Sequence, residues 1–187
     1  TPALQNIPIL IGAYSAGKKK MIPQIKKILY ATDLSKNSSY AFLYATDLAK
    51  RQGAKIVILH AIEPVPTYVE VYGGVTVDMQ QRQQGEIVEQ MKKHLQEFCK
   101  KAEAQIGPPC AELVSKILVP LGHPPEEILN AADKEGCDVI VLGTHGKGFL
   151  AHTFLGSVSS AVLHRTRKPV FIIPLPSEKA GIDWDGI

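Results

Sequence analysis

One stretch near the carboxyl end of the sequence combines residue types and a spacing that suit anion binding. Gly143-Thr144-His145-Gly146 is followed by nine residues and then by Gly156-Ser157. Glycines let backbone N–H groups approach a ligand without a Cβ in the way. A Gly-Ser pair at the start of a helix adds unpaired N–H groups and the positive end of the helix dipole. Phosphate is the ligand that these features suit best. By itself, however, the stretch predicts only a generic phosphate-binding loop.

The elements that must position this stretch alternate between strands and helices. Short, largely apolar runs predict strands at 27–31, 54–61, 114–119, 139–142 and 169–174. Caps and helical spacing predict helices from Ser35 or Ser38 to about Lys50, and over about 78–104, 124–134 and 157–165. Gly53 would close the first helix, and Ile87, Met91, Leu95 and Phe98 follow helical spacing in the second. This alternation predicts a three-layer α/β sandwich with a five-stranded parallel sheet.

Ligands bind to such sheets outside the carboxyl ends of the strands, where the strand order reverses. Four segments follow strands at that edge: Ala31-Thr32-Asp33, Ala61, Leu121-Gly122 and the glycine stretch. The topology, rather than any single residue, therefore predicts a binding site built from several strand ends.

The composition is that of an ordinary soluble globular protein of 187 residues, 45% hydrophobic and 21% charged. Its net charge of +3 comes from Lys18, Lys19 and Lys20, because 18 basic residues face 18 acidic ones from Met21 onward. No basic stripe is interleaved with aromatic residues, so nucleic-acid binding is not expected. No apolar run approaches the roughly 20 residues of a membrane span. Three cysteines without paired spacing indicate a reduced, cytoplasmic protein.

Residues 1–20 differ from the remainder of the chain. Their apolar run, 7–12, precedes the basic cluster, which is the reverse of the order in a secretory signal. We interpret residues 1–20 as an N-terminal extension or leader, with a loosely docked arm favoured over a targeting role. The predicted domain spans 21–176, and 177–187 form a C-terminal tail.

With these motifs in place, the chain resembles the universal stress protein family. The nucleotide signature of that family, Gly-x2-Gly-x9-Gly-(Ser/Thr), is matched by Gly143, Gly146, Gly156 and Ser157 without a gap. Four further segments that look like the family's lie at 26–35, 58–61, 122–128 and 168–170. The resemblance covers roughly residues 21–174. It implies a Rossmann-like fold, similar to that of the adenine nucleotide alpha hydrolases, with strand order 3-2-1-4-5.

The resemblance also implies ATP, or AMP or ADP, as the ligand, and it assigns a region of the nucleotide to each segment. The residues bordering the adenine and ribose would be Ala31, Thr32, Asp33 and, through its backbone, Ala61, with Leu121 and Gly122 as the opposite wall. The residues around the ribose and phosphates would be Gly143, His145, Gly146 and Lys147, and those holding the phosphate oxygens would be Gly156, Ser157, Val158 and Ser159.

Simpler roles stay open for several of these residues. Asp33 could cap the following turn, and Ser157 could serve only as a helix cap. The backbone of His145 is a better candidate than its imidazole, and Lys147 lacks the context of a P-loop lysine. His60, at a strand end, is more typical of a satisfied core or edge residue than of a ligand-binding one.

The sequence favours a binding protein over an enzyme. It contains no Walker motif, paired carboxylates, Ser-His-Asp arrangement or zinc spacing that we can identify, so at most slow ATP hydrolysis or autophosphorylation is expected. Mg²⁺ would be bridged by phosphates and water, without dedicated protein ligands. The resemblance suggests a homodimer joined through the last strand, Val170-Phe171-Ile172-Ile173, which is also a plausible sheet edge.

Two other functions compete with that of a non-enzymatic ATP-binding protein. The first is a dimerising interaction module that binds no nucleotide, against which the intact glycine signature argues. The second is an adenylate-handling enzyme of the wider adenine-binding α/β group. The absence of a His-x-x-His or Ser-Gly-Gly-x-Asp motif counts against it.

Overall fold

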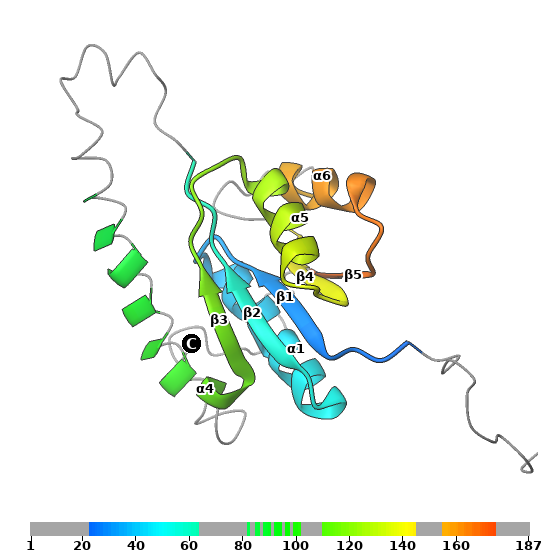
Figure 1. Ribbon diagram of the computed structural model, residues 1–187, viewed down its shortest axis with the longest axis horizontal. Helices are drawn as coiled ribbons and strands as arrows, with labels where there is room; N and C mark the ends of the chain where they lie inside the picture. The colour runs from blue at the N-terminus through cyan, green and yellow to red at the C-terminus, as the bar shows by residue number, and fades with distance from the viewer. Residues whose placement is uncertain are drawn as a thin grey trace, which may run out of the picture.

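A five-stranded parallel sheet in the order β3-β2-β1-β4-β5 forms the centre of the molecule (Figure 1). The computed structural model describes residues 23–63, 110–144 and 155–174, and helical positions at 82, 85–86, 88–90, 92–94, 96–97 and 99–101. The strands are β1 (Lys27–Ala31), β2 (Lys55–Leu59), β3 (Val114–Leu118), β4 (Val139–Gly143) and β5 (Val170–Ile173). The helices are α1 (Lys36–Gln52), α4 (Cys110–Leu113), α5 (Pro124–Lys134) and α6 (Ser157–Arg165). The predicted α/β class, parallel sheet and strand order are confirmed.

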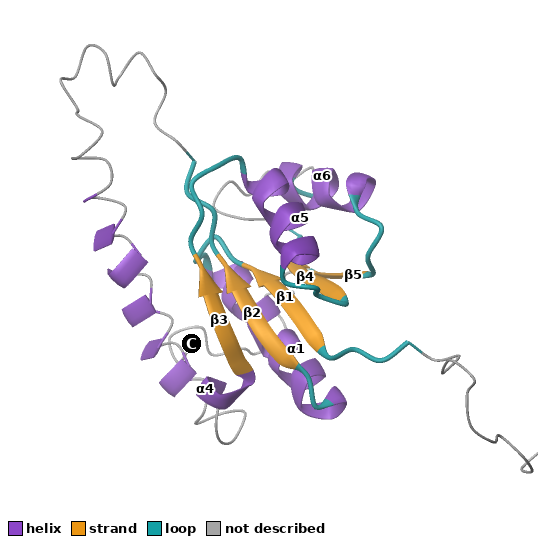
Figure 2. Ribbon diagram, viewed as in Figure 1, coloured by secondary structure: helices purple, strands orange, loops and turns teal. Residues whose placement is uncertain are grey.

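Helices cover both faces of the sheet (Figure 2), and an apolar layer lies between the sheet and the helices on each face. Successive side chains of a strand point to opposite faces. Ile28 and Tyr30 of β1 therefore pack against α1, whereas Leu29 and Ala31 pack against α5 and α6. Because both faces are covered, β1, β2 and β4 are almost fully buried, which explains their nearly continuous apolar sequences.

Local signals in the sequence locate most helix boundaries. α5 and α6 occupy the predicted ranges 124–134 and 157–165. The N-cap of α1 is Ser35, whose hydroxyl oxygen accepts a hydrogen bond from the N–H of Ser38, and Gly53 ends the helix in the left-handed conformation at φ 64°. The four-residue helix α4 was not predicted, because one turn is too short to show a helical period.

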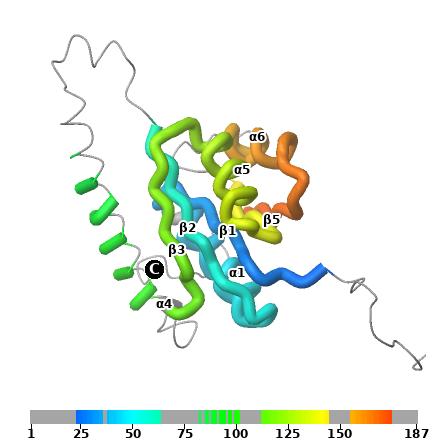
Figure 3. The backbone as a smooth tube through the Cα atoms, viewed as in Figure 1, coloured from blue at the N-terminus to red at the C-terminus, as the bar shows by residue number. Residues whose placement is uncertain are grey.

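β2, β3 and β5 are shorter than the apolar runs that predicted them, and the difference matters at β2. A strand was expected over 54–61, but β2 ends at Leu59. Beyond it, the N–H groups of His60 and Ile62 still donate to the carbonyls of Leu118 and Pro120, both at 2.9 Å. The chain beyond β2 therefore stays beside the chain beyond β3 while it departs from β1 (Figure 3).

Some sequence predictions fall partly or wholly outside the described residues. The described positions between 82 and 101 are helical, in agreement with a helix over about 78–104. The apolar positions predicted for that helix, Ile87, Met91, Leu95 and Phe98, are not described. The same holds for residues 1–20 and 177–187.

Candidate functional site

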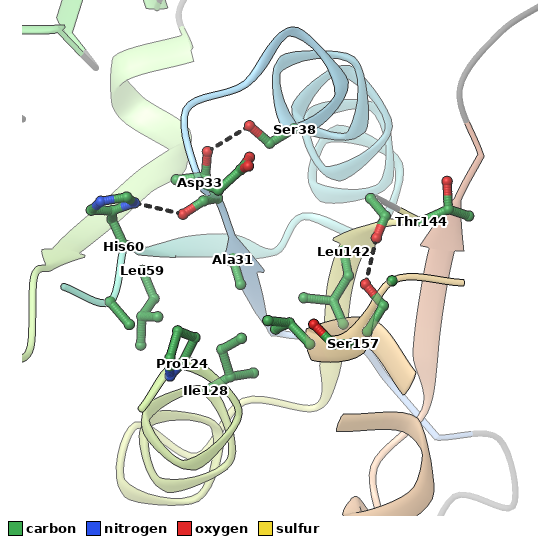
Figure 4. Close-up of a pocket in the computed structure, with 16 residues that line it drawn as sticks. Ala31, Asp33, Ser38, Leu59, His60, Pro124, Ile128, Leu142, Thr144 and Ser157 are labelled. Carbon is green, nitrogen blue, oxygen red and sulfur yellow. Dashed lines mark hydrogen bonds between the residues drawn. The ribbon is translucent and has the colours of Figure 1, made fainter. Parts of the chain in front are cut away.

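A cavity of about 310 Å³ lies at the carboxyl ends of β1, β2 and β4, beside the first turns of α5 and α6 (Figure 4). This is the position at which strand order reverses in the sheet, and its volume is within the range of small-molecule sites. The lining residues are Ala31, Thr32, Asp33, Ser38, Leu59, His60, Ala61, Pro124, Ile128, Leu142, Gly143, Thr144, Gly156, Ser157, Val158 and Ser159.

Nine of the fourteen residues predicted for the site line this cavity. They are Ala31, Thr32, Asp33, Ala61, Gly143, Gly156, Ser157, Val158 and Ser159. Leu121 and Gly122 are not among the lining residues: Leu121 is 47% exposed, and a Cβ on Gly122 would lie 2.5 Å from Oε1 of Glu127. His145, Gly146 and Lys147 lie outside the described residues.

The first turn of α6 is the part of the cavity best suited to an anion. Gly156 is the N-cap; its N–H donates to the Thr144 carbonyl at 2.7 Å, and its own carbonyl accepts from the N–H of Ser160 at 2.9 Å. Within the described part of the chain, the N–H groups of Ser157, Val158 and Ser159 have no acceptor. The first turn contains no acidic residue to compete for the positive helix end.

Two hydrogen bonds fix this turn to the end of β4. The Gly156 bond to Thr144 is one, and the other runs from the Ser159 hydroxyl to the Gly143 carbonyl at 2.7 Å. Ser159 is only 6% exposed. Because its hydroxyl proton is directed at Gly143, Ser159 would meet a ligand through its backbone N–H and not through its hydroxyl.

The start of α5, across the cavity, has the opposite electrostatic character. Pro124 and Pro125 have no N–H to donate, and Glu126 and Glu127 place carboxylates in the first turn. Pro124 and Ile128 contribute apolar surface to the cavity. This side therefore suits an uncharged, flat group, whereas the α6 side suits an anion. Figure 4 shows Pro124 and Ile128 apart from Ser157 on different walls.

A compact polar turn joins β1 to α1 at the rim. Oδ1 of Asp33 accepts hydrogen bonds from the Ser35 N–H at 3.1 Å and from the Ser35 hydroxyl at 2.6 Å. The Thr32 hydroxyl donates to Ser38 Oγ at 2.9 Å and accepts from the Leu34 N–H at 3.0 Å. Asp33 thus supports the cap of α1, as the simpler interpretation held, and it also lines the cavity. It is the only acidic or basic side chain apart from His60 among the described lining residues.

His60 lines the cavity although it is not among the fourteen predicted site residues. Its Nδ1 lies 2.8 Å from the Thr32 carbonyl oxygen, and Figure 4 shows the ring turned toward the loop that carries Asp33. A carbonyl oxygen only accepts, so Nδ1 carries the proton. The sequence feature that could have indicated His60 as a lining residue is its position at a strand end, immediately before Ala61.

Two further features of the described residues concern metal ions and membranes. The described residues contain no group of three or more His, Cys, Asp or Glu side chains arranged to hold a metal ion. In the same part of the chain, no helix has both the length and the apolar character needed to cross a bilayer.

Comparison with known proteins agrees with this architecture. A universal stress protein of Thermus aquaticus is 33% identical over 149 residues, covering 79% of this chain and 98% of its own. The universal stress protein MJ0577 of Methanocaldococcus jannaschii is 28% identical over 157 residues, which cover 79% of this chain and 94% of that protein. Its solved structure superposes with a TM-score of 0.65 over 83% of this chain and all of that one.

A universal stress protein solved in complex with cAMP shares the fold, with a TM-score of 0.53 and 24% identity, over 81% of this chain and 98% of its own. The sequence profile of the universal stress protein family matches residues 24–174, which include every described strand of the sheet. The chain therefore belongs to the universal stress protein family.

Proposed function

We propose that this protein binds ATP in the cavity between α5 and α6 and acts as a nucleotide-dependent stress-response or signalling protein. The opposed character of the two helix starts carries the proposal. Among the described residues, the start of α6 has three N–H groups with no acceptor and no acid in its first turn, and the start of α5 has two prolines and apolar surface. A nucleotide has the matching polarity, with a charged phosphate chain at one end and a flat base at the other.

The phosphates would lie at α6. Charge-assisted hydrogen bonds from backbone N–H groups stabilise phosphate without a lysine or arginine, and neither of these residues is among the described ones that line the cavity. His145, Gly146 and Lys147 follow Thr144 directly, and we propose that they complete the ribose and phosphate side. Mg²⁺ would be held by the phosphates and water.

The base would lie between the end of β2 and the start of α5. Leu59, Pro124, Ile128 and Leu142 supply apolar surface there, and Ala61 supplies backbone polar groups. Asp33 is placed at the rim, where its carboxylate would accept hydrogen bonds from ribose hydroxyls instead of meeting the phosphates. The relative solved with cAMP holds an adenine nucleotide on the same fold, which supports an adenine base here.

We propose binding, with at most slow hydrolysis or autophosphorylation, as the chemical activity. The two titratable side chains in the lining, Asp33 and His60, are both held by the loop: Oδ1 of Asp33 accepts from Ser35, and Nδ1 of His60 donates to Thr32. Rapid phosphoryl transfer needs a positioned nucleophile together with cations that neutralise the developing charge. The described lining residues supply no such combination.

The proposal is tested by identifying what the purified protein carries and binds. Protein is denatured, and the released small molecules are separated by chromatography and identified by mass spectrometry. Titration calorimetry of nucleotide-free protein then compares ATP, ADP, AMP and triphosphate alone. We expect ATP to bind at about one per chain and more tightly than triphosphate. Absence of released nucleotide together with no heat on adding ATP would contradict the proposal and favour the nucleotide-free interaction module.

A further inference from the structure

The hydrogen-bond ladder between β1 and β2 stops one step earlier than its register allows. The two strands pair in parallel from Lys27 with Lys55 to Ala31 with Leu59. The ladder continues with the Thr32 N–H, which donates to the Leu59 carbonyl at 2.9 Å. In a parallel ladder the next bond would run from the Ala61 N–H to the Thr32 carbonyl. That bond is absent, although both residues are described.

The imidazole of His60 takes the place of the missing bond. Its Nδ1–H donates to the Thr32 carbonyl at 2.8 Å, so the imidazole stands at the oxygen that the Ala61 N–H would otherwise approach. The neighbouring N–H groups of His60 and Ile62 are held on the other side, by the carbonyls of Leu118 and Pro120. These bonds hold the segment after β2 beside the segment after β3, and Figure 3 shows the two running together.

Ala61 is left with an unpaired donor and an unpaired acceptor at the cavity. Its N–H and its carbonyl have no partner among the described residues, and Ala61 lines the cavity. Both groups of one extended residue point to the same side of a strand, which here is the side toward β1. Partly buried backbone groups in this state are uncommon in folded proteins, and a ligand would satisfy them.

A neighbouring donor and acceptor complement adenine better than hypoxanthine or guanine. Adenine presents a ring-nitrogen acceptor beside an amino donor, whereas the other two bases present a carbonyl where adenine has the amino group. We propose that His60 is a positioning residue for base selectivity: by bonding the Thr32 carbonyl, it keeps the β1–β2 ladder open and the Ala61 backbone available to the base. This inference rests on the proposed nucleotide function.

The test compares two substitutions that differ in one property. His60→Asn keeps a side-chain N–H near the position of Nδ1, and His60→Leu removes the donor while keeping an apolar side chain. Dissociation constants for ATP and inosine triphosphate are measured by calorimetry, because these ligands share the ribose and phosphates and differ in the base. We expect the wild-type protein to prefer ATP about tenfold, as is typical of one or two neutral hydrogen bonds.

In His60→Leu we expect that preference to fall to about twofold or less, with the inosine triphosphate affinity changed by less than about threefold. His60→Asn should restore most of the preference. A general structural defect would weaken the binding of both ligands equally and leave the ratio of their dissociation constants unchanged. Retention of the wild-type ratio in His60→Leu would overturn the inference.

A second readout needs no nucleotide. Amide hydrogen exchange followed by NMR should show a fast-exchanging Ala61 N–H in the free wild-type protein and a slower one in His60→Leu, where the ladder can close onto Thr32. A protected Ala61 N–H in the wild type would overturn the inference whatever the protein binds. If Ala61 exchanges fast but neither nucleotide binds, the proposed function fails, and base selectivity fails with it.

Discussion

Single residues at the α6 start decide how an anion would be held. Ser157 occupies the first helical position, follows the N-cap Gly156, and has a free N–H in the described part of the chain. Its hydroxyl and its N–H are separate donors, and they can be removed one at a time. Proline is tolerated at this position because its fixed φ is helical and the missing N–H has no partner within the helix.

We predict that Ser157→Pro weakens ATP binding by about tenfold or more relative to Ser157→Ala, since a hydrogen bond to a charged group contributes about 1.5–3 kcal/mol. Ser157→Ala is the matched control, because it removes the hydroxyl and keeps the N–H. Calorimetry gives both affinities, and thermal unfolding checks that α6 is intact. Equal affinities in the two variants would show that this N–H is not a phosphate ligand.

A second prediction at the residue scale concerns Cys137, which is 1% exposed and belongs to the apolar layer on the α5 and α6 face of the sheet. Burial raises the pKa of its thiol from 9.0 to about 11. The unfolded chain therefore loses this proton at lower pH than the folded one. The contribution to stability is complete below about pH 9 and is lost as the pH rises toward about 11.

We predict a loss of about 1 kcal/mol in the free energy of unfolding between about pH 8 and about pH 10, measured by urea denaturation. Cys137→Ala should be less stable at neutral pH but should show a flatter dependence over this range. An equally steep fall in the variant would assign the pH dependence to other groups. Burial also raises the pKa of Tyr30, whose ordinary value is 10.0, so Tyr30 contributes mainly at still higher pH.

At the scale of elements, both ends of α1 are fixed by local contacts, and its start borders the cavity. Its start is fixed by Ser35 and Asp33, and its end by Gly53, whose N–H donates to the carbonyls of Ala49 and Lys50. An added Cβ at Gly53 would have no atom within 4 Å, so the glycine is required by its φ of +64° and not by crowding.

Gly53→Ala should therefore lower the free energy of unfolding by about 1 kcal/mol, the cost of the left-handed conformation for a residue with a Cβ. Gly53→Asn should lower the free energy of unfolding by less, because asparagine adopts the left-handed conformation more readily. Urea denaturation at neutral pH measures both. A fully stable alanine variant would mean that the turn after α1 relaxes to another conformation.

At the scale of the whole molecule, the two sheet edges are β3 and β5. β5 was predicted to be an edge, and the strand order confirms it. The carbonyl of Pro169 accepts a hydrogen bond from the N–H of Ile140 in β4, and the carbonyl of Ile173 accepts one from the N–H of Thr144, just beyond β4. Because N–H and carbonyl of one residue point to the same side, Val170 and Ile172 direct theirs to the free edge. Phe171 is 45% exposed beside them.

We propose that two copies pair along β5, and we predict that Ile172→Pro weakens this dimer by at least about tenfold while the monomer stays folded. Proline removes an N–H from the free edge and leaves the bonds to β4 in place. Ile172→Ala controls for the lost side chain. Light scattering after size-exclusion chromatography, over a range of concentrations, gives the oligomeric state. An unchanged dimer in Ile172→Pro would exclude pairing through this edge.

Much of the fold could be predicted because its signals are local. A capping serine, a proline at a helix start and a closing glycine act within a few residues, so the predicted ranges of α5 and α6 agree with the structure. The apolar runs of β1, β2 and β4 reflect burial on both faces. The strand order came from the family resemblance, since no local pattern encodes which strands are neighbours.

The sequence by itself determined the class of fold, the approximate elements and the segments that follow the strand ends, including Asp33, Ala61 and Gly156-Ser157. Only the tertiary structure decided which polar groups of those segments remain unpaired. The Ser159 hydroxyl donates to the Gly143 carbonyl, and the His60 imidazole, rather than the Ala61 N–H, donates to the Thr32 carbonyl. These choices depend on contacts between residues up to 28 positions apart, where small shifts of packed strands select one hydrogen-bond partner over another.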